Sequence, residues 1–184
     1  MESCFICEKH RQGDAAQGGI IYDDDLVYAG HTHALRGPAA YRGYLMVEPK
    51  RHALGLGDLT DDEAAAIGRL VNRLARALKD VGGAEHVYSF VFGPAVPHLH
   101  VHVAPRYPGT PHEYWGARLN EWPDAPRVNP EGMREDMQPY RKTRSTEHEE
   151  ASRHTCADCE HLHCRCLMPS IKPARDRATS TVAH

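Results

Sequence analysis

Apolar positions recur at helical spacing in the middle of the chain. They are Ile67, Leu70, Val71, Leu74 and Leu78. The stripe follows residues 60–63, whose sequence Thr-Asp-Asp-Glu has the form of a capping box and places acidic groups at the positive end of the helix dipole. Two consecutive glycines at 82–83 end the pattern. The sequence therefore predicts one long helix that begins after Thr60 and buries its apolar stripe in the core.

Short segments rich in β-forming residues lie on both sides of this helix. Residues 25–29 and 43–48 form one pair, and Pro49 limits the second of them. Residues 86–92 and 97–104 form another pair, separated by a Gly-Pro turn. The first pair is expected to lie as antiparallel neighbours, and the second is expected to be a strand pair. Because only one crossover helix is evident, the fold class is predicted to be α+β rather than a doubly wound parallel sheet.

The composition changes along the chain. With 184 residues and 41% hydrophobic content, the chain is long enough for one core but too short for two full domains. Residues 1–126 read as a globular domain, whereas residues 127–184 are rich in charge, His and Cys and have few large apolar positions. Such a segment buries too little to offset the entropy of ordering, so we predict an irregular and mostly disordered tail.

Charge and hydropathy restrict the partners. The formal net charge of -3 provides no basic field for non-specific nucleic-acid binding. The chain also starts without a basic and then apolar leader, and no stretch is apolar for long enough to span a bilayer. We therefore expect a cytoplasmic protein with neither membrane nor bulk nucleic acid as a partner.

Residues 98–102 read His-Leu-His-Val-His. In a strand, alternate side chains share a face, so the three histidines would line one surface while Leu99 and Val101 enter the core. Imidazole suits nucleophilic or acid–base work near neutral pH. Two other interpretations are a metal-binding strand, which is a serious rival, and a solvated strand face, which the intervening apolar residues disfavour. His31 and His33, in a Gly-containing segment, are expected to be solvated.

The histidine run and its surroundings resemble a known family. Residues 93–106 are similar to the signature of the histidine triad (HIT) family, and residues 44–52 resemble that family's strand ending in Pro-Lys-x-His. The resemblance covers roughly residues 4–122. It implies an α+β HIT-like catalytic domain with an antiparallel sheet, one long and one shorter helix, and usually a homodimer. It also implies a purine nucleotide or nucleoside monophosphate conjugate as the partner.

The resemblance assigns roles to two histidines. His100 would attack the α-phosphorus and form a covalent nucleotidyl-histidine intermediate, and His102 would contact phosphate oxygens, making the chain a nucleotide hydrolase or nucleotidyl transferase. Where many members carry hydrogen-bonding residues after the glycine, this chain has Pro94 and Ala95. That departure motivates the alternative of a non-catalytic nucleotide-binding or sensing module stabilised by zinc, and it leaves the leaving group and the base open.

The six cysteines fall into two clusters: Cys4 with Cys7, and Cys156, Cys159, Cys164 and Cys166. Without a secretory signal, close pairs suggest metal ligands or redox chemistry sooner than disulfides. The family resemblance implies that Cys4 and Cys7 join His52 and His98 in a Cys₂His₂ structural zinc site. The alternative is that both cysteines are ordinary thiols and His52 is a surface or phosphate-site residue.

The second cysteine cluster also contains His161 and His163. It has enough ligands for a second zinc ion, but its spacing fits no pattern that we can name. An unstructured tail is the favoured interpretation, with a second zinc as the minority one.

Overall fold

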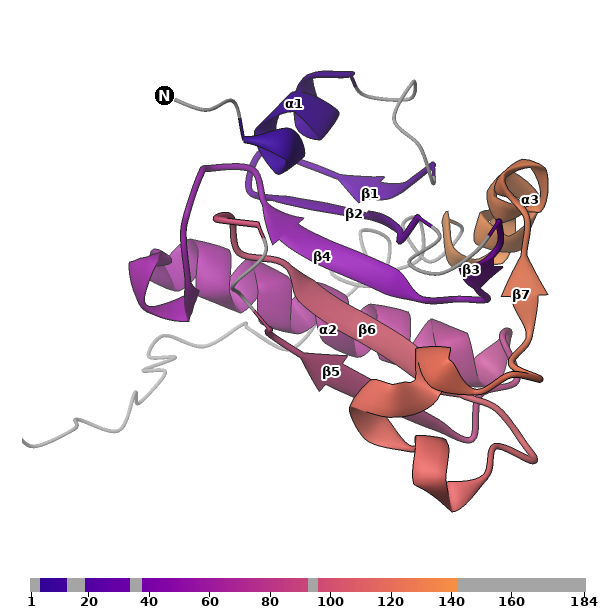
Figure 1. The fold of residues 1–184 in the computed structure, drawn as a ribbon. Coiled ribbons are helices and arrows are strands. Elements are labelled where there is room, and N and C mark those ends of the chain that lie inside the picture. Colours follow the sequence, from indigo (N-terminus) through magenta and orange to yellow (C-terminus); the bar gives the residue numbers. More distant parts are fainter. Residues whose placement is uncertain (1–3, 13–18, 34–37, 93–95, 142–184) are drawn as a thin grey trace, which may run out of the picture.

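The computed structural model describes residues 4–12, 19–33, 38–92 and 96–141, and Figure 1 shows their arrangement. A five-stranded sheet runs in the order β1-β2-β4-β6-β5, with every neighbouring pair antiparallel. Its strands are β1 (Ile20–Asp23), β2 (Val27–His31), β4 (Leu45–Pro49), β6 (Val101–Arg106) and β5 (His86–Phe90). A two-stranded sheet pairs β3 (Ala40–Tyr41) with β7 (Arg127–Val128). The α+β class and the antiparallel sheet are confirmed.

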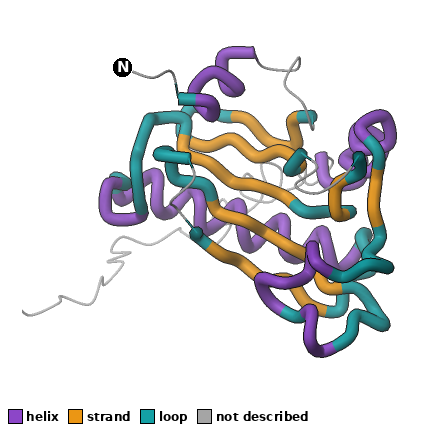
Figure 2. Tube along the Cα trace, in the orientation of Figure 1, coloured by secondary structure: helices purple, strands orange, loops and turns teal. Residues whose placement is uncertain are grey.

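In the described part of the chain, three α-helices accompany these sheets. Figures 1 and 2 show where they lie. They are α1 (Phe5–Gln12), α2 (Asp61–Asp80) and α3 (Pro130–Arg141). Short 3₁₀ helices lie at η2 (Leu56–Asp58), η3 (His112–Tyr114) and η4 (Gly116–Glu121). No helix within the described ranges combines the length and apolar character needed to cross a membrane.

The long helix α2 starts where the sequence predicts. The Thr60 hydroxyl accepts a hydrogen bond from the Glu63 backbone N–H, and the Glu63 carboxylate accepts one from the Thr60 N–H at 2.8 Å. This reciprocal cap satisfies two donors that the helix itself leaves unpaired. The helix ends before Gly82, where a Cβ atom would lie 2.5 Å from the Leu78 carbonyl oxygen. The predicted boundaries of this helix are therefore confirmed.

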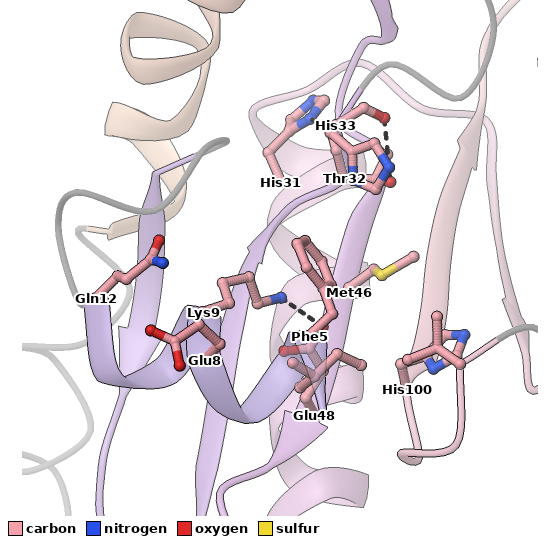
Figure 3. A pocket seen from close by; sticks show the side chains of 12 residues that line it. Phe5, Glu8, Lys9, Gln12, His31, Thr32, His33, Met46, Glu48 and His100 are labelled. Carbon is pink, nitrogen blue, oxygen red and sulfur yellow. Dashed lines mark hydrogen bonds and ion pairs between the residues drawn. The ribbon is translucent and has the colours of Figure 1, made fainter. Parts of the chain in front are cut away.

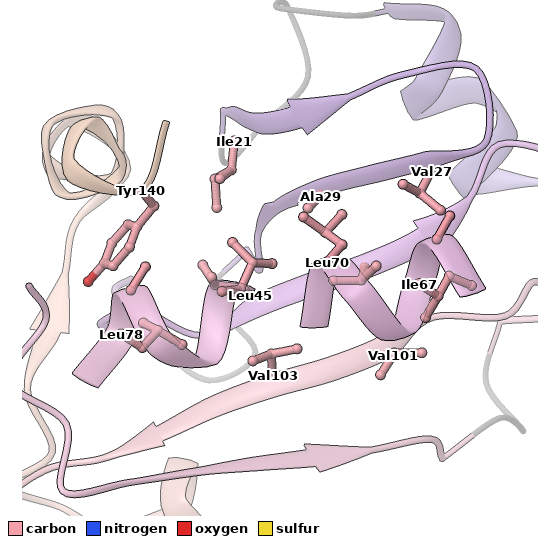
Figure 4. Packing of buried hydrophobic residues seen from close by; sticks show 14 of the residues in the cluster. Ile21, Val27, Ala29, Leu45, Ile67, Leu70, Leu78, Val101, Val103 and Tyr140 are labelled. Carbon is pink, nitrogen blue, oxygen red and sulfur yellow. The ribbon is translucent and has the colours of Figure 1, made fainter. Parts of the chain in front are cut away.

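One face of the sheet and one face of α2 form the main core (Figure 4). The helix contributes the predicted stripe, with Val71 at the partly buried edge. The sheet contributes alternate residues of neighbouring strands: Val27, Ala29, Leu45, Val47, Val101 and Val103. Because side chains alternate across a strand, the residues between these positions point to the opposite face of the sheet.

The strand predicted at 97–104 begins later than predicted. It starts at Val101, so His98 and His100 precede it. The reason is the hydrogen bond of the Leu99 backbone. Its N–H donates to the Ala53 carbonyl at 2.7 Å and not to a neighbouring strand. Leu99 nevertheless faces the core as predicted, because its side chain is only 2% exposed and belongs to the main core cluster.

The packed domain extends beyond the predicted boundary at 126. Residues 127–128 pair with β3, and α3 packs onto the domain, with Met133 and Tyr140 only 3% and 2% exposed. These two apolar residues are seven positions apart, which places them on the same side of a helix. Two well-placed side chains therefore anchor a segment whose composition suggested disorder. The second cysteine cluster lies outside the described residues.

Candidate active site and metal centre

The face of the sheet opposite α2 carries polar side chains. On β4, Leu45 and Val47 point to the core, so Met46 and Glu48 point to the other face. The 3 histidines of the run, at 98, 100 and 102, also lie away from α2, and each is at most 9% exposed. The part of this face around Glu48 and the three histidines is therefore a buried polar layer, and the short helix α1 contacts it through hydrogen bonds to Glu48.

His100 has a fixed orientation. Its Nδ1 lies 2.7 Å from the main-chain carbonyl oxygen of His98. A carbonyl only accepts, so Nδ1 carries the proton, and in the neutral ring Nε2 then holds a free lone pair. The His100 side chain lines a cavity of about 410 Å³ (Figure 3). The imidazole is thus buried, oriented and in contact with a space that a small molecule can enter.

His102 lies beside His100, with ring centroids 5.0 Å apart. The Tyr44 hydroxyl is 3.2 Å from its Nδ1, and the Phe92 ring covers it at a centroid distance of 5.1 Å. Burial, reinforced by the charge of His100, lowers the pKa of His102 to about 4. Burial also raises the pKa of Tyr44 to about 12. At neutral pH this pair is therefore a neutral imidazole beside a protonated phenol.

The cavity has walls of mixed character. Its apolar lining comes from Phe5, Ile6, Met46 and Val96. Its polar lining includes Lys9, Thr32, His33 and Glu48, besides His100. Its volume lies within the range of about 300–1,000 Å³ that is usual for small-molecule sites, and an apolar wall with a few polar groups is typical of them.

Cys4, Cys7, His52 and His98 converge in the structure, with one ligand atom of each lying within 4.8 Å of the others. The Nδ1 of His98 is 3.4 Å from each of the two sulfur atoms, and the Nδ1 of His52 is 3.5 Å from the Cys7 sulfur. Tetrahedral zinc, with Zn–S of about 2.3 Å and Zn–N of about 2.05 Å, separates such atoms by about 3.5 Å. The four residues therefore fit a Cys₂His₂ metal site.

The surroundings of this cluster favour a metal. His98 Nε2 is 2.9 Å from the Pro49 carbonyl, so that nitrogen carries the proton and Nδ1 presents its lone pair to the sulfurs. Burial and the neighbouring Cys4 raise the pKa of the Cys7 thiol. A divalent cation would reverse this by stabilising two adjacent thiolates.

The family model of the HIT domain matches residues 15–109, which is more than half of the chain. The chain belongs to the HIT family. Two crystal structures with the same fold are a zinc-bound histidine triad protein from Mycobacterium smegmatis (23% identity, TM-score 0.58, covering 81% of this chain and 97% of that one) and a Hit-like protein from Bartonella henselae (21%, 0.57, 78% and 98%). No curated protein matches.

A third structure of this HIT fold is a hypothetical histidine triad nucleotide-binding protein from Sulfolobus tokodaii. It is 19% identical, with a TM-score of 0.57, and the match covers 76% of this chain and 91% of that one. At these identities the likeness shows the fold alone. It does not identify the substrate of this HIT protein.

Two features of this HIT protein differ from what its sequence suggested. His31 is not solvated but 5% exposed at the end of β2, where Nδ1 donates to the Thr32 carbonyl at 2.6 Å and burial lowers the pKa of the ring. His33, in contrast, is exposed and lines the cavity. Glu48 was not predicted to belong to the site, because its only signal in the sequence is a carboxylate within an otherwise apolar strand. Pro94 and Ala95 lie outside the described residues.

Proposed function

We propose that this HIT protein is an enzyme that hydrolyses or transfers the nucleoside monophosphate group of a nucleotide conjugate, through a covalent nucleotidyl intermediate on His100. The observation that carries the proposal is the hydrogen bond from His100 Nδ1 to the His98 carbonyl, because it leaves Nε2 as the nucleophilic nitrogen beside the cavity. A pre-oriented imidazole with an available lone pair is suited to nucleophilic catalysis at phosphorus.

The proposed first step forms one bond to phosphorus and breaks one. His100 Nε2 bonds to the α-phosphorus, and the bond from phosphorus to the leaving group breaks with its electron pair on that group. The ring becomes an N-nucleotidyl imidazolium that keeps its proton on Nδ1. The His98 carbonyl oxygen, 2.7 Å away, stabilises that charge. Water or another acceptor then attacks phosphorus and restores the neutral ring.

His102 is proposed to donate a hydrogen bond to a phosphate oxygen. Since its pKa is lowered to about 4, the ring is neutral in use and has one N–H to give. When the Tyr44 hydroxyl donates to Nδ1, the proton of His102 is on Nε2, on the far side of the ring. The two imidazoles then have complementary tautomers, with Nε2 of His100 attacking and Nε2 of His102 donating.

The substrate is proposed to be a purine nucleotide conjugate. The apolar side chains of Phe5, Ile6 and Met46 line the cavity and provide surfaces for a planar base. The cavity is adjacent to His100, so a base bound there leaves the α-phosphate within reach of the ring. The leaving group is not specified by these contacts.

The metal is proposed to be structural zinc, held by Cys4, Cys7, His52 and His98 in a closed site that supplies folding energy rather than an activated water. Its ligands join the start of α1 to the segment that carries His100. Two free cysteines kept for a metal are typical of a reducing compartment, which supports a cytoplasmic location.

A homodimer is proposed through the outer edge of β5, with which no strand of the described ranges pairs. Tyr88, Phe90 and Phe92 stack along this side of the sheet, with centroids 5.8 and 5.4 Å apart, and Phe92 is half exposed. An edge strand with an aromatic row is a surface that pairs readily with a second copy. Sedimentation of the full chain as a monomer at micromolar concentration would reject this part of the proposal.

Mass spectrometry after brief incubation with adenylylated substrates tests the central proposal. The panel should place amine, sulfate, phosphate and nucleotide leaving groups on AMP. We expect an adenylyl adduct on His100 that is absent in His100→Ala and present in His86→Ala, an exposed histidine on β5. Tight binding without an adduct or turnover on any member would instead identify a non-catalytic nucleotide-binding module.

A further inference from the structure

Glu48 is a buried carboxylate at the cavity. Its side chain is 0% exposed, and each of its two oxygens has a partner on α1. Lys9 Nζ lies 2.6 Å from Oε1, and His10 Nε2 lies 2.8 Å from Oε2. Figure 3 shows the Lys9 side chain reaching from the helix toward Glu48. One residue of the sheet thus holds two consecutive residues of the helix.

The position of α1 matters because the helix forms much of the cavity wall. Among the described residues, five of the lining side chains come from α1: Phe5, Ile6, Glu8, Lys9 and Gln12. Only Ile6 of this helix is a buried apolar residue. A helix of 8 residues is too short to be stable by itself, so its contacts with the sheet must keep it in place.

Two groups of contacts, which we call clamps, hold α1 against the sheet. The first is the metal cluster, which includes Cys4 and Cys7 at the start of the helix. The second is Glu48, which acts one turn later. Because Val47 pairs with Val101 in antiparallel register, Glu48 lies one position beyond that pair, on the side of His100. The second clamp therefore fixes α1 close to the proposed nucleophile.

The physical character of Glu48 fits a positioning role. Although burial raises its pKa, the hydrogen bond from His10 and the charge of Lys9 together hold the pKa of Glu48 below its usual range. A carboxylate that stays buried without these partners would cost several kcal/mol, so Lys9 and His10 must stay beside Glu48 for as long as the site is closed. The Lys9 ammonium also lies 4.9 Å from the centroid of the Tyr28 ring, which further restricts it.

We propose that Glu48 is a positioning residue of the substrate site, which holds α1 through Lys9 and His10 as the wall of the nucleotide cavity. The role of the cavity rests on the proposed function, whereas the docking of α1 does not. Because both of its oxygens are occupied by Lys9 and His10, Glu48 acts through the helix. Its loss should weaken nucleotide binding more than it slows the chemical step.

Two variants of the full, zinc-loaded chain test this role. Glu48→Met removes the carboxylate and leaves Lys9 and His10 facing an apolar group. The triple variant Lys9→Met/His10→Leu/Glu48→Met replaces the whole ionic cluster by apolar residues, a change that buried ion clusters often tolerate. Asp23→Asn is the matched control, since it breaks the ion pair between Asp23 and Lys50 outside the cavity.

Three measurements follow each variant: hydrogen exchange of the peptide covering 5–12, zinc content, and calorimetric titration with AMP and GMP. For Glu48→Met we expect exchange of α1 to accelerate about tenfold or more and the nucleotide Kd to rise about tenfold, with zinc retained. For a substrate that the enzyme converts, KM of Glu48→Met should rise by a larger factor than kcat falls. The triple variant should restore α1 protection and bring Kd back to near its original value.

Several outcomes would overturn the role. One is unchanged α1 exchange and unchanged Kd in Glu48→Met, and another is a triple variant that docks α1 but does not recover binding, which would make Lys9 a direct ligand contact. If Glu48→Met does not fold, Glu48→Gln and the triple variant give the same comparison. An original chain that binds neither nucleotide contradicts the proposed function instead, while the exchange data still decide whether Glu48 holds the helix.

Discussion

The main-chain carbonyl of His98 accepts a 2.7 Å hydrogen bond from Nδ1 of His100, while the side chain of His98 belongs to the Cys₂His₂ cluster. One residue therefore faces the metal site with its ring and the proposed nucleophile with its backbone. This connects two features that the sequence presents separately, a cysteine pair at the start of the chain and a histidine run near residue 100.

Loss of the metal should consequently affect both stability and the active site. The double change Cys4→Ser/Cys7→Ser should remove near-stoichiometric zinc from protein purified without added zinc, because it deletes both sulfur ligands. We expect the melting temperature to fall by several degrees, since about 1 kcal/mol corresponds to roughly 2–4 °C at this chain length. Nucleotide affinity should fall as well.

The tail provides a matched control for this experiment. Cys156→Ser/Cys159→Ser also removes two close cysteines, and it should leave one zinc per chain and the melting temperature unchanged. A zinc content that halves in the tail variant would reveal a second site. Unmutated protein that contains no metal by elemental analysis would end the zinc assignment.

Tyr44→Phe should slow the reaction without weakening binding. The substitution removes the hydroxyl 3.2 Å from His102 Nδ1 but keeps the ring, which meets the His102 ring edge-on at 5.7 Å. Without that partner the proton of His102 is no longer directed to Nε2. We expect kcat to fall about tenfold, the equivalent of one hydrogen bond of about 1.4 kcal/mol, with KM nearly constant.

Tyr41→Phe is the control for Tyr44→Phe. Its hydroxyl is also buried, but it donates to the Pro105 carbonyl at 2.8 Å. This variant should lose stability and keep its rate. Equal rates for the two variants in single-turnover experiments would contradict the role given to Tyr44.

Stability should decrease toward acid pH through His102. Burial, together with the His100 charge, lowers its folded-state pKa to about 4, whereas the unfolded chain has a pKa of about 6.5. Between these values the unfolded state binds the extra proton, so the free energy of unfolding is highest above pH 6.5 and falls as the pH falls toward 4. The contribution is about 3 kcal/mol at most.

Urea unfolding of His102→Gln at several pH values measures this contribution. The variant should lose less stability than the original chain between pH 6.5 and 4.5. Both proteins keep the metal ligands and His31, so acid effects at those groups are common to the two curves. Parallel curves would show that His102 does not titrate in this window.

Much of the fold is readable from local patterns in the sequence. The capping box at Thr60 and the apolar stripe of α2 specify this helix by nearest-neighbour chemistry, and both are found as predicted. The alternation around His100 correctly predicts which side chains face the core, although the strand itself starts only at Val101. The start of β6 was not predictable in the same way. It depends on a backbone hydrogen bond from Leu99 to Ala53, and no pattern in either segment indicates that these two meet.

The cluster around Glu48 shows a second limit. A carboxylate in an apolar strand signals that a partner must exist, but its partners Lys9 and His10 lie about 40 positions earlier, on a helix too short to be recognised by periodicity. Long-range pairing of this kind is set by where α1 docks. Similarly, the composition of residues 127–141 gave no indication that Met133 and Tyr140 would be buried.

The position of α3 leads to a prediction about the extent of the domain. Tyr140 belongs to the main core, and its hydroxyl lies beside Gly82, where a Cβ would come within 2.7 Å of the hydroxyl oxygen. Asp136 accepts a hydrogen bond from Arg42 at 2.8 Å.

A chain ending at residue 126 should therefore be less stable than the full chain by about 3 kcal/mol or more, because it loses two large buried side chains. A chain ending at residue 141 should match the full chain within about 0.5 kcal/mol in urea unfolding. If the shorter chain were equally stable, α3 would be a passive addition and the domain would end where the composition changes.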